Sequence, residues 1–238
     1  ERGQELVYYA HQVRALTDEF KATLNKEEQL TGHIHIVTPD SICDDMINSN
    51  YMDFHKRYPS ISICFTTGDS GVMLSMLDHN EADFIITLDG HLYNKDYVIA
   101  KEELVPMHFV ASANSKFAGK KNLSIKDIIN EPFILTENGQ GYRRVFDKEL
   151  AKKSLEIVPV LEIGRTDMIT SLVAQGDMIS FLPDFVTKPL IDSGELIYID
   201  VCDMNLEIWK QLIYHKNKWI SKSLKTVIEY IIANDFFN

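Results

Sequence analysis

The sequence predicts an α/β protein of two units, in which the chain enters the second unit and returns to the first, with a long helix in front. Three observations indicate this class. Short apolar runs alternate with helical patterns from residue 33 to residue 88, extended segments follow one another without a helix after about residue 95, and a seven-residue apolar repeat fills residues 1–28. Alternating strands and helices are typical of parallel sheets with right-handed crossovers.

Composition limits the classes of function. The chain has 238 residues, 45% of them hydrophobic, which is enough for a large core. Its formal charge of −11 opposes tight binding to phosphate backbones, because such binding depends on clustered Lys and Arg. No run of about 18 apolar residues predicts a membrane span, and the first thirty residues lack a secretory signal, so we expect a cytoplasmic protein without a membrane partner.

Residues 1–28 are predicted to form one long helix whose apolar positions follow an a/d heptad stripe. We interpret this stripe as a dimerisation surface between chains, with a helix packed on its own globule as the alternative. The pattern begins without a capping residue, so we expect further protein upstream. The residues of the stripe are Leu6, Tyr9, Val13, Leu16 and Phe20.

The first unit reads as βαβαβ. "HIHIVTPD", "SISICFTTGD" and "FIITL" are typical of strands, with Ile34 and Ile36 on one face of the first. "SICDDMINSNYMDFHKRY", ending before Pro59, and "SGVMLSMLDHNEAD" have helical patterns between them. "YVIAKEELVPMHFVASANS" then gives extended segments, which we interpret as a strand crossing to the second unit.

The second unit resumes the alternation. Helices are predicted near 124–129, 141–153 and 167–175, with a short one from 184, and the strands between them are "FILT", "EIVPVLEI" and "MISFLP". "ELIYID" and "LEIWKQLIYHK" are extended, and a final amphipathic helix carries Leu224, Val227, Ile228 and Ile231. No internal repeat is strong enough to assign.

Residues 164–183, "GRTDMITSLVAQGDMISFLP", predict a helix followed by a strand that is apolar on both faces. Thr166 is expected to cap the helix, and Gly176 to end it in the left-handed conformation. Ligands of open α/β sheets bind beyond the carboxyl ends of strands, where helices begin, so Arg165 and Thr166 are candidate ligand contacts. The expected buried stripe of this helix is Met168, Ile169, Leu172 and Val173.

Four runs, "FHKRYPSISICF", "LSMLDHNEADFII", "LVAQGDMISFLPDFV" and "LIYHKNKWIS", follow the heptad helix in order. In this order and spacing they resemble the effector-binding domain of LysR-type transcriptional regulators, and the likeness covers residues 1–235. The family usually has a glycine near Asn80 and often another at Asp177, and both departures fall in turns.

The resemblance implies two Rossmann-like subdomains joined by two crossing strands, the type 2 periplasmic-binding-protein-like fold, with a small-molecule effector bound between them. Residues 1–28 would be the linker helix, 31–108 with 213–238 subdomain I, and 109–212 subdomain II. The resemblance also implies a homodimer or homotetramer that binds DNA only through an N-terminal winged helix-turn-helix missing from this chain. Neither an enzymatic activity nor a cofactor is implied.

Carried over by motif, the effector contacts follow the strands of both subdomains. The same hydroxyl side chains are also ordinary helix caps, which is the alternative interpretation. Arg143, Arg144 and Arg165 favour a carboxylate, whereas Asp40 and Asp69 repel an anion, so an amino-acid-like effector suits both sets. Alternatively these charges are surface groups. The expected contacts are Thr38, Asp40, Ser41, Thr67, Gly68, Thr136, Asn138, Arg165 and Thr166.

Other chemistry finds little support. His33 and His35 have the spacing of two metal ligands, but no third follows from the sequence, so we predict no metal site. Cys43, near a predicted helix start, could have a lowered pKa and sense oxidants, although three scattered cysteines favour structural thiols. No catalytic motif is present, which argues against an enzyme. The alternative class is an extracytoplasmic solute-binding protein of a transporter.

Overall fold

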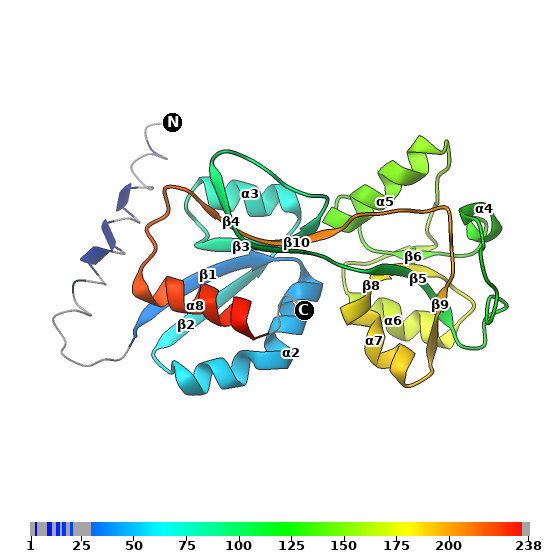
Figure 1. The fold of residues 1–238 in the computed structure, drawn as a ribbon, viewed down its shortest axis with the longest axis horizontal. Coiled ribbons are helices and arrows are strands. Elements are labelled where there is room, and N and C mark those ends of the chain that lie inside the picture. The colour runs from blue at the N-terminus through cyan, green and yellow to red at the C-terminus, as the bar shows by residue number, and fades with distance from the viewer. Residues whose placement is uncertain are drawn as a thin grey trace. The chain divides into compact units, whose positions relative to one another are not determined.

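The computed structural model describes residues 30–234 and a few residues before them, and it divides into two compact units (Figure 1). Unit 1 holds the described residues up to Thr87, together with Leu92–Glu103 and the chain from Lys210 on. Unit 2 holds Leu88–His91 and Leu104–Trp209. The described residues of the N-terminal segment are Gly3, Tyr9, Ala10, Val13, Arg14, Leu16, Thr17 and Phe20.

Unit 1 is a five-stranded sheet in the order β2-β1-β3-β10-β4. β1 runs parallel to β2 over seven registered pairs, from Gly32 opposite Ile61 to Thr38 opposite Thr67, and it also runs parallel to β3. The predicted βαβαβ unit is therefore confirmed. Its elements are β1 (Gly32–Thr38), α2 (Asp40–Arg57), β2 (Ile61–Thr67), α3 (Ser70–Asp78), β3 (Phe84–Asp89), β4 (Tyr97–Leu104), β10 (Trp209–His215) and α8 (Lys222–Ala233).

Helices cover both faces of this sheet. α3 buries Met73 and Leu77 against Val37, Ile85 and Ile213. α2 and α8 lie together on the other face, as Figure 1 shows. All four apolar positions predicted for the last helix are buried, at 7% exposure or less.

The described part of unit 2 has nine strands and helices, which are built around a second sheet. β5 pairs antiparallel with β8 and with β9, and β6 pairs parallel with β7. A parallel bridge between Phe133 and Ile179 joins β6 to β8. The elements are β5 (Met107–Ser112), α4 (Ile125–Ile128), β6 (Ile134–Leu135), α5 (Gly141–Lys152), β7 (Leu161–Glu162), α6 (Thr166–Gln175), β8 (Ser180–Pro183), α7 (Asp184–Asp192) and β9 (Leu196–Ile199).

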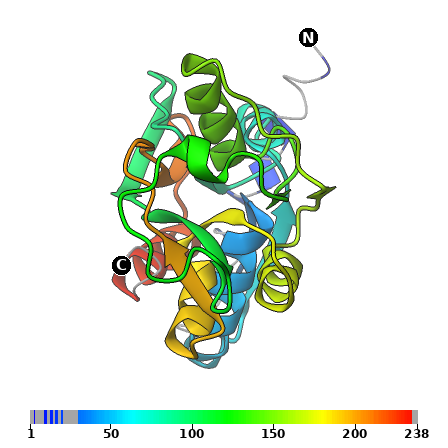
Figure 2. The same cartoon turned by 90° about the vertical axis from the view of Figure 1, so that its right-hand side faces the viewer.

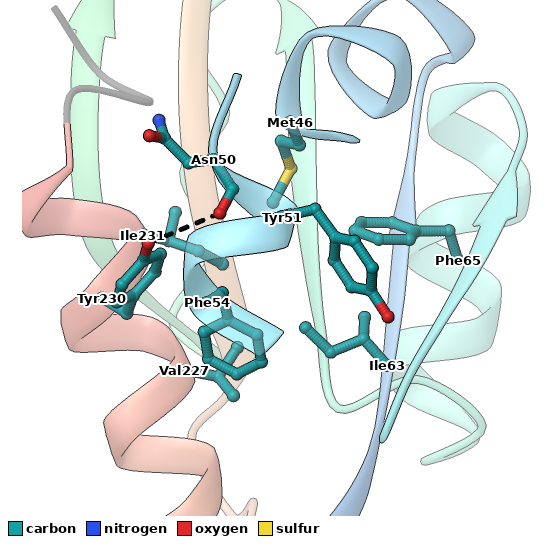
Figure 3. A pocket seen from close by; sticks show the side chains of 9 residues that line it. All are labelled: Met46, Asn50, Tyr51, Phe54, Ile63, Phe65, Val227, Tyr230 and Ile231. Atoms are coloured by element: carbon teal, nitrogen blue, oxygen red, sulfur yellow. Dashed lines mark hydrogen bonds between the residues drawn. The ribbon is translucent and has the colours of Figure 1, made fainter. Parts of the chain in front are cut away.

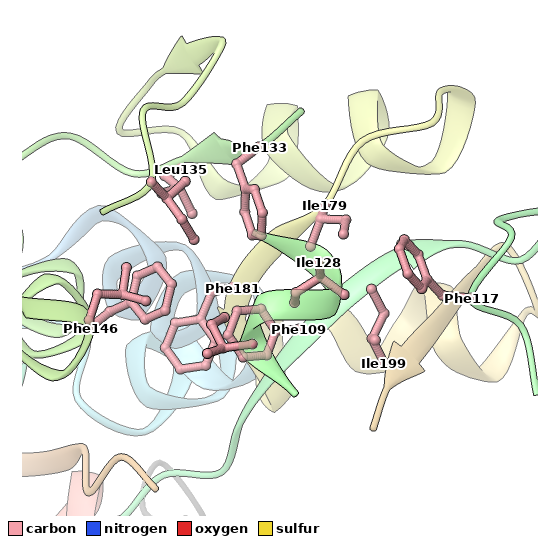
Figure 4. Packing of buried hydrophobic residues seen from close by; sticks show 13 residues of the cluster. Phe109, Phe117, Ile128, Phe133, Leu135, Phe146, Ile179, Phe181 and Ile199 are labelled. Carbon is pink, nitrogen blue, oxygen red and sulfur yellow. The ribbon is translucent and has the colours of Figure 1, made fainter. Parts of the chain in front are cut away.

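Phenylalanines build the core on one face of the unit 2 sheet (Figure 4). The rings of Phe109 and Phe146 both pack on Phe181, with ring centroids 5.6 Å apart from each other and 4.9 Å from Phe181. On the opposite face, α6 buries Ile169 and Val173. Figure 2, which looks onto unit 2, shows α5 and α7 on opposite sides of the sheet.

The two ends predicted for helix α6 are wrong. Arg165, rather than Thr166, occupies the cap position of α6, and Thr166 is its first helical residue. Gly176 has an extended backbone, with φ −133° and ψ −179°. A Cβ there would lie 2.8 Å from the Met178 Cε, the end of a flexible side chain that can shift, so neither a left-handed backbone nor a rigid contact requires glycine at this position.

The buried stripe of α6 also differs from the prediction. Ile169 and Val173 are buried as expected, but Met168 and Leu172 are 47% and 36% exposed. Thr166 and Thr170 are buried in their place. The predicted strand "EIVPVLEI" shrinks to two residues of β7, because Val158, Val160 and Leu161 point largely to solvent instead of alternating into a core.

The chain crosses between the units at residues 103–104 and 209–210. The Val105 amide donates to the Ile208 carbonyl oxygen at 2.8 Å, so the two crossing segments run side by side. Two residues away on each segment, the buried Lys210 ammonium pairs with the Glu103 carboxylate at 2.6 Å. The expected pair of crossing strands is confirmed, as is the α/β fold of two units.

Four positions of the predicted heptad stripe lie among the described residues, and all four are helical and exposed. Tyr9, Val13 and Phe20 are each about 60% exposed and Leu16 is 47% exposed. Leu6 lies outside the described residues. Across the described part of the chain, no helix combines the length and apolar character needed to cross a membrane.

Candidate functional site

In unit 1 the loops after β1 and β2 meet. The Gly68 amide donates to the Thr38 carbonyl oxygen at 3.2 Å, which brings the two predicted contact loops together. Thr38 is fully buried, and its hydroxyl donates to the Ile86 carbonyl oxygen at 3.1 Å. Its hydroxyl is therefore already used in holding β1 to β3.

The helix starts behind these loops differ in their capping. α2 begins at Asp40, with Ser41 buried behind it, and its cap position Pro39 offers no side-chain acceptor. Asp69 caps α3, because its carboxylate accepts from the Val72 amide at 2.9 Å. Thr67 is exposed at the end of β2. Unit 1 thus presents two carboxylates near the predicted site.

In unit 2 the equivalent end is that of β6. Thr136 follows this strand and is buried, whereas Asn138 is exposed in the loop that leads to α5. Gly139 in this loop has φ +99°, a conformation that favours glycine. The Arg143 guanidinium donates to the Thr136 carbonyl oxygen at 2.7 Å and fixes the loop against α5.

Two buried hydroxyls beside the start of α5 lack hydrogen bonds. Neither the Thr136 Oγ1 nor the Tyr142 Oη meets a partner within hydrogen-bond geometry, although the two side chains are neighbours. Burial raises the pKa of Tyr142, and the Thr136 hydroxyl lowers it only in part. Because buried polar groups are nearly always paired, these two hydroxyls are candidates for contact with a ligand or water. The sequence did not indicate Tyr142, which lies on an otherwise ordinary helical face.

Arg165 stands at the start of α6, as predicted, but it already has a carboxylate partner. Its guanidinium makes two hydrogen bonds to Asp167, at 2.7 Å and 3.0 Å. The Arg165 hydrogen bond lowers the pKa of Asp167, against a smaller opposing effect of desolvation. Both side chains are about half exposed, so the pair is accessible to solvent and weak.

The other two arginines of the predicted anion set are also paired. Arg143 is buried and contacts Asp147 and Glu162 at 2.9 Å and 3.0 Å. Arg144 pairs with the buried carboxylate of Asp89 at 2.6 Å. Each of the three arginines therefore meets at least one acidic side chain of the protein itself, a feature that sequence spacing did not reveal.

The histidines and the buried cysteine have structural roles. His33 bonds to Ser62, and His35 bonds to Thr66 and to the Glu81 carbonyl oxygen. Within the described residues, no group of three or more His, Cys, Asp or Glu could hold a metal ion. Desolvation, with Asp44 and Asp40 adding to it, raises the pKa of Cys43 to about 11, opposite to the lowering considered from its position near a helix start.

A small pocket lies elsewhere in unit 1, between α2, β2 and α8 (Figure 3). Its lining is almost entirely apolar, with Met46, Phe54 and Val227 among the side chains, and none of the predicted contact residues is part of it. The Tyr230 hydroxyl closes one end with a 3.4 Å bond to the Asn50 carbonyl oxygen. We interpret this pocket as a packing gap between two helices, because its surface is almost entirely apolar and the Tyr230 hydroxyl already has a partner.

Comparison with known proteins assigns the family. The family model described as the LysR substrate binding domain matches residues 27–235. YwqM of Bacillus subtilis, an HTH-type transcriptional regulator, is 27% identical over 233 residues, which cover 96% of this chain and 78% of that protein. The chain belongs to the LysR substrate-binding domain family.

Solved structures agree on the fold. The regulatory domain of CcmR from Synechocystis, in complex with 2-PG, matches with a TM-score of 0.69 and 20% identity, over 85% of this chain and 97% of that one. The effector binding domain of QuiR, in complex with shikimate, matches with a TM-score of 0.64 and 16% identity, over 86% and 97% of the two chains. The type 2 periplasmic-binding-protein-like fold is therefore confirmed.

These comparisons also bear on the class of function. The chain is the effector-binding domain of a LysR-type transcriptional regulator, and the relative named above is a regulator and not an enzyme. They do not favour the alternative of an extracytoplasmic solute-binding protein.

Proposed function

We propose that the domain binds a small, carboxylate-bearing or amino-acid-like effector and that the unpaired Thr136 hydroxyl is a principal contact. This single observation carries the proposal, because a buried hydroxyl without a partner costs about 1–3 kcal/mol unless a ligand or water satisfies it. The start of α5 and the half-exposed Arg165 lie in the same unit and would supply further donors.

The proposed contacts keep the full predicted set. In unit 1 the effector would meet Asp40, Ser41 and the loop at Thr67 and Gly68, with Thr38 holding that loop through its carbonyl oxygen. In unit 2 it would meet Thr136, Asn138, Arg165 and Thr166. The carboxylates of Asp40 and Asp69 suit an ammonium group, which supports an effector with both charges.

The pairing of all three arginines refines the chemistry. An effector carboxylate would have to compete with Asp167 for Arg165. Separating the existing pair costs little free energy, because both side chains are half exposed. Arg143 would stay in its buried position and hold the loop. The two ligands in the related structures, shikimate bound to QuiR and 2-PG bound to CcmR, support small polar effectors for this family.

Occupancy would act through a population shift. An effector with different affinities for two arrangements of the domain favours one of them by that difference. We propose that the change is transmitted within a homodimer or homotetramer, assembled in part through the helix that bears Tyr9, Val13, Leu16 and Phe20. The oligomer would bind DNA through a winged helix-turn-helix absent from this chain.

A thermal-shift screen tests the proposal. Wild type and Thr136→Val are heated with amino acids, hydroxy acids, aromatic carboxylates and phosphorylated acids, and binders are then titrated by calorimetry. A compound that stabilises the wild type should bind Thr136→Val about tenfold more weakly, because one hydrogen bond of roughly 1.4 kcal/mol is lost. Equal affinities would remove Thr136 from the site, and Thr226→Val, far along the chain on the exposed side of α8, is the control.

A further inference from the structure

Residues Leu88–His91, which we call the β3 strap, group with unit 2 although β3 belongs to the sheet of unit 1. The strap contains Leu88 and Asp89, the last two residues of β3, and contacts α5. The chain returns to unit 1 at Leu92, whose amide donates to the Gln211 side-chain oxygen at 2.8 Å. These four residues are therefore part of unit 2, although β3 begins in unit 1.

Asp89 is the centre of this contact. Its side chain is 2% exposed, yet it is a carboxylate. The Arg144 Nη2 donates to its Oδ2 at 2.6 Å, and the Gly90 amide donates to its Oδ1 at 2.7 Å. A carboxylate this deeply buried requires such donors to remain charged.

The strap is pressed against the first residue of α5. A Cβ placed on Gly141 would lie 2.3 Å from the Leu88 carbonyl oxygen and 3.0 Å from the Asp89 Cγ. The carboxyl group thus sits at the end of α5 where the helix dipole favours a negative charge. α5 has no acidic residue in its own first turn, and its cap residue Gln140 makes no side-chain cap. Asp89 supplies the missing negative charge from elsewhere in the chain.

The same end of α5 carries the two unpaired hydroxyls. Thr136 and Tyr142 are both more than nine-tenths buried, and Tyr142 lies in the first turn of the helix, next to Gly141. The Arg144 side chain remains 62% exposed, so a solute can reach its guanidinium. This end of α5 therefore combines an accessible cation, a helix start, a resident carboxylate and hydroxyls without partners.

We propose that the start of α5 and Arg144 form an anion-binding site, that Asp89 is its resident carboxylate, and that an anionic group of an effector binds there by displacing Asp89 together with the β3 strap. This inference rests on the proposed function for the identity of the displacing molecule. The exchange replaces the Asp89 carboxylate with another anion on Arg144, while the Gly90 amide leaves with the strap, so Arg144 keeps a charged partner. Binding of an effector anion at the start of α5 thereby moves the β3 strap, which includes the end of β3.

Chemical rescue tests the site without knowledge of the effector. Asp89→Ala removes the resident carboxylate and leaves room beside Gly141 and Arg144. In sodium chloride the variant should melt at least about 3 °C below the wild type. Sodium formate at the same ionic strength supplies a free carboxylate and should restore half or more of that loss, while the wild type responds equally to the two salts. Should Asp89→Ala fail to fold in chloride, its refolding yield in formate against chloride gives the same comparison.

Two variants serve as controls. Asp89→Ala combined with Arg144→Ala should not respond to formate, because the cation of the site is gone. Asp96→Ala removes a carboxylate from a surface pair with Lys216, away from any helix start, and should show no specific formate effect. Hydrogen exchange of the strap amides should quicken in Asp89→Ala and slow again in formate.

Equal melting of Asp89→Ala in formate and chloride, with unchanged strap exchange, would overturn the inference. Rescue of the double variant would do the same, because it would show that formate acts elsewhere. These outcomes are independent of the Thr136→Val titration. The formate test can contradict the displacement of the strap while the Thr136→Val titration supports the effector proposal. The titration can equally contradict the effector proposal while formate rescue supports the anion site.

Discussion

In unit 1 the sheet order is β2-β1-β3-β10-β4, and in unit 2 the strands β7, β6, β8, β5 and β9 occupy the same five places once the bridge between Phe133 and Ile179 is included. In both units the fourth strand belongs to a crossing segment. β1 and β2 share seven registered pairs, whereas β6 and β7 share two. The two units thus share a strand order, but the outer parallel strands are paired over a longer stretch in unit 1 than in unit 2.

The matched threonines show what this difference means. Thr38 ends β1 and Thr136 follows β6, and both are buried. The Thr38 hydroxyl has a backbone partner, while the Thr136 hydroxyl has none. Unit 1 satisfies the hydroxyl at the end of β1, although the Thr87 hydroxyl in β3 has no partner. Unit 2 leaves the Thr136 hydroxyl unsatisfied and has the Asp89 carboxylate of β3 at the start of α5. At this matched position, unit 2 is therefore the half in which a ligand could satisfy the threonine hydroxyl.

The largest expected difference in stability is between alanine substitutions of the glycines at the starts of α5 and α3. Gly141→Ala forces a Cβ onto the Leu88 carbonyl oxygen and should destabilise the protein by about 3 kcal/mol. Gly71→Ala in α3 meets only the Asp69 carboxylate, at 3.1 Å, and should stay within about 1 kcal/mol of wild type. Urea unfolding measures both variants. Similar losses would mean that the strap contact is not specific to unit 2.

The second effect concerns thiols. With its pKa raised to about 11, the Cys43 thiol has about a hundredfold less thiolate at pH 8 than an ordinary thiol and should alkylate correspondingly slowly. Exposed Cys202 of unit 2 is the internal control. A raised thiol pKa also implies that the stability contributed by neutral Cys43 is present below pH 9 and lost toward pH 11. Rapid iodoacetamide labelling of Cys43 in the folded protein would show that its site opens.

The smallest effect on stability is expected at Arg165. The Arg165 guanidinium pairs with the half-exposed Asp167 carboxylate, so Arg165→Ala should change the free energy of unfolding by less than about 0.5 kcal/mol. Effector affinity should nevertheless fall about ten- to a hundredfold. Calorimetry and thermal unfolding separate the two. A large drop in melting temperature without ligand would give Arg165 a structural role.

The sequence predicted the order of helices and strands well wherever the apolar pattern reflected burial. Ile34 and Ile36, and the stripe of the last helix, are buried as their spacing indicated. The prediction failed at α6, where Thr166 and Thr170 replace Met168 and Leu172 on the buried side. Residue type does not reveal which face of a short amphipathic helix meets the sheet when threonines can pack there.

The site was predicted less completely. Strand ends and helix starts follow from local patterns, so the positions of Thr38 and Thr136 at the ends of strands could be predicted, while their contact with an effector stays a prediction. Pairing partners such as Asp89 for Arg144, 55 residues apart in sequence, depend on the tertiary fold. The need for glycine at position 141 could not be predicted from the local sequence either, because it arises from the close approach of the Leu88 carbonyl oxygen in the folded protein.

One matched measurement tests the contrast between the units most directly: the free energy of unfolding, without ligand, of Thr38→Val and Thr136→Val. Thr38→Val removes the hydrogen bond to the Ile86 carbonyl oxygen and should cost about 1–2 kcal/mol. Thr136→Val loses no bond and should leave stability unchanged or raise it. Equal destabilisation by the two substitutions would contradict the account, because it would show that the Thr136 hydroxyl is already satisfied within the protein.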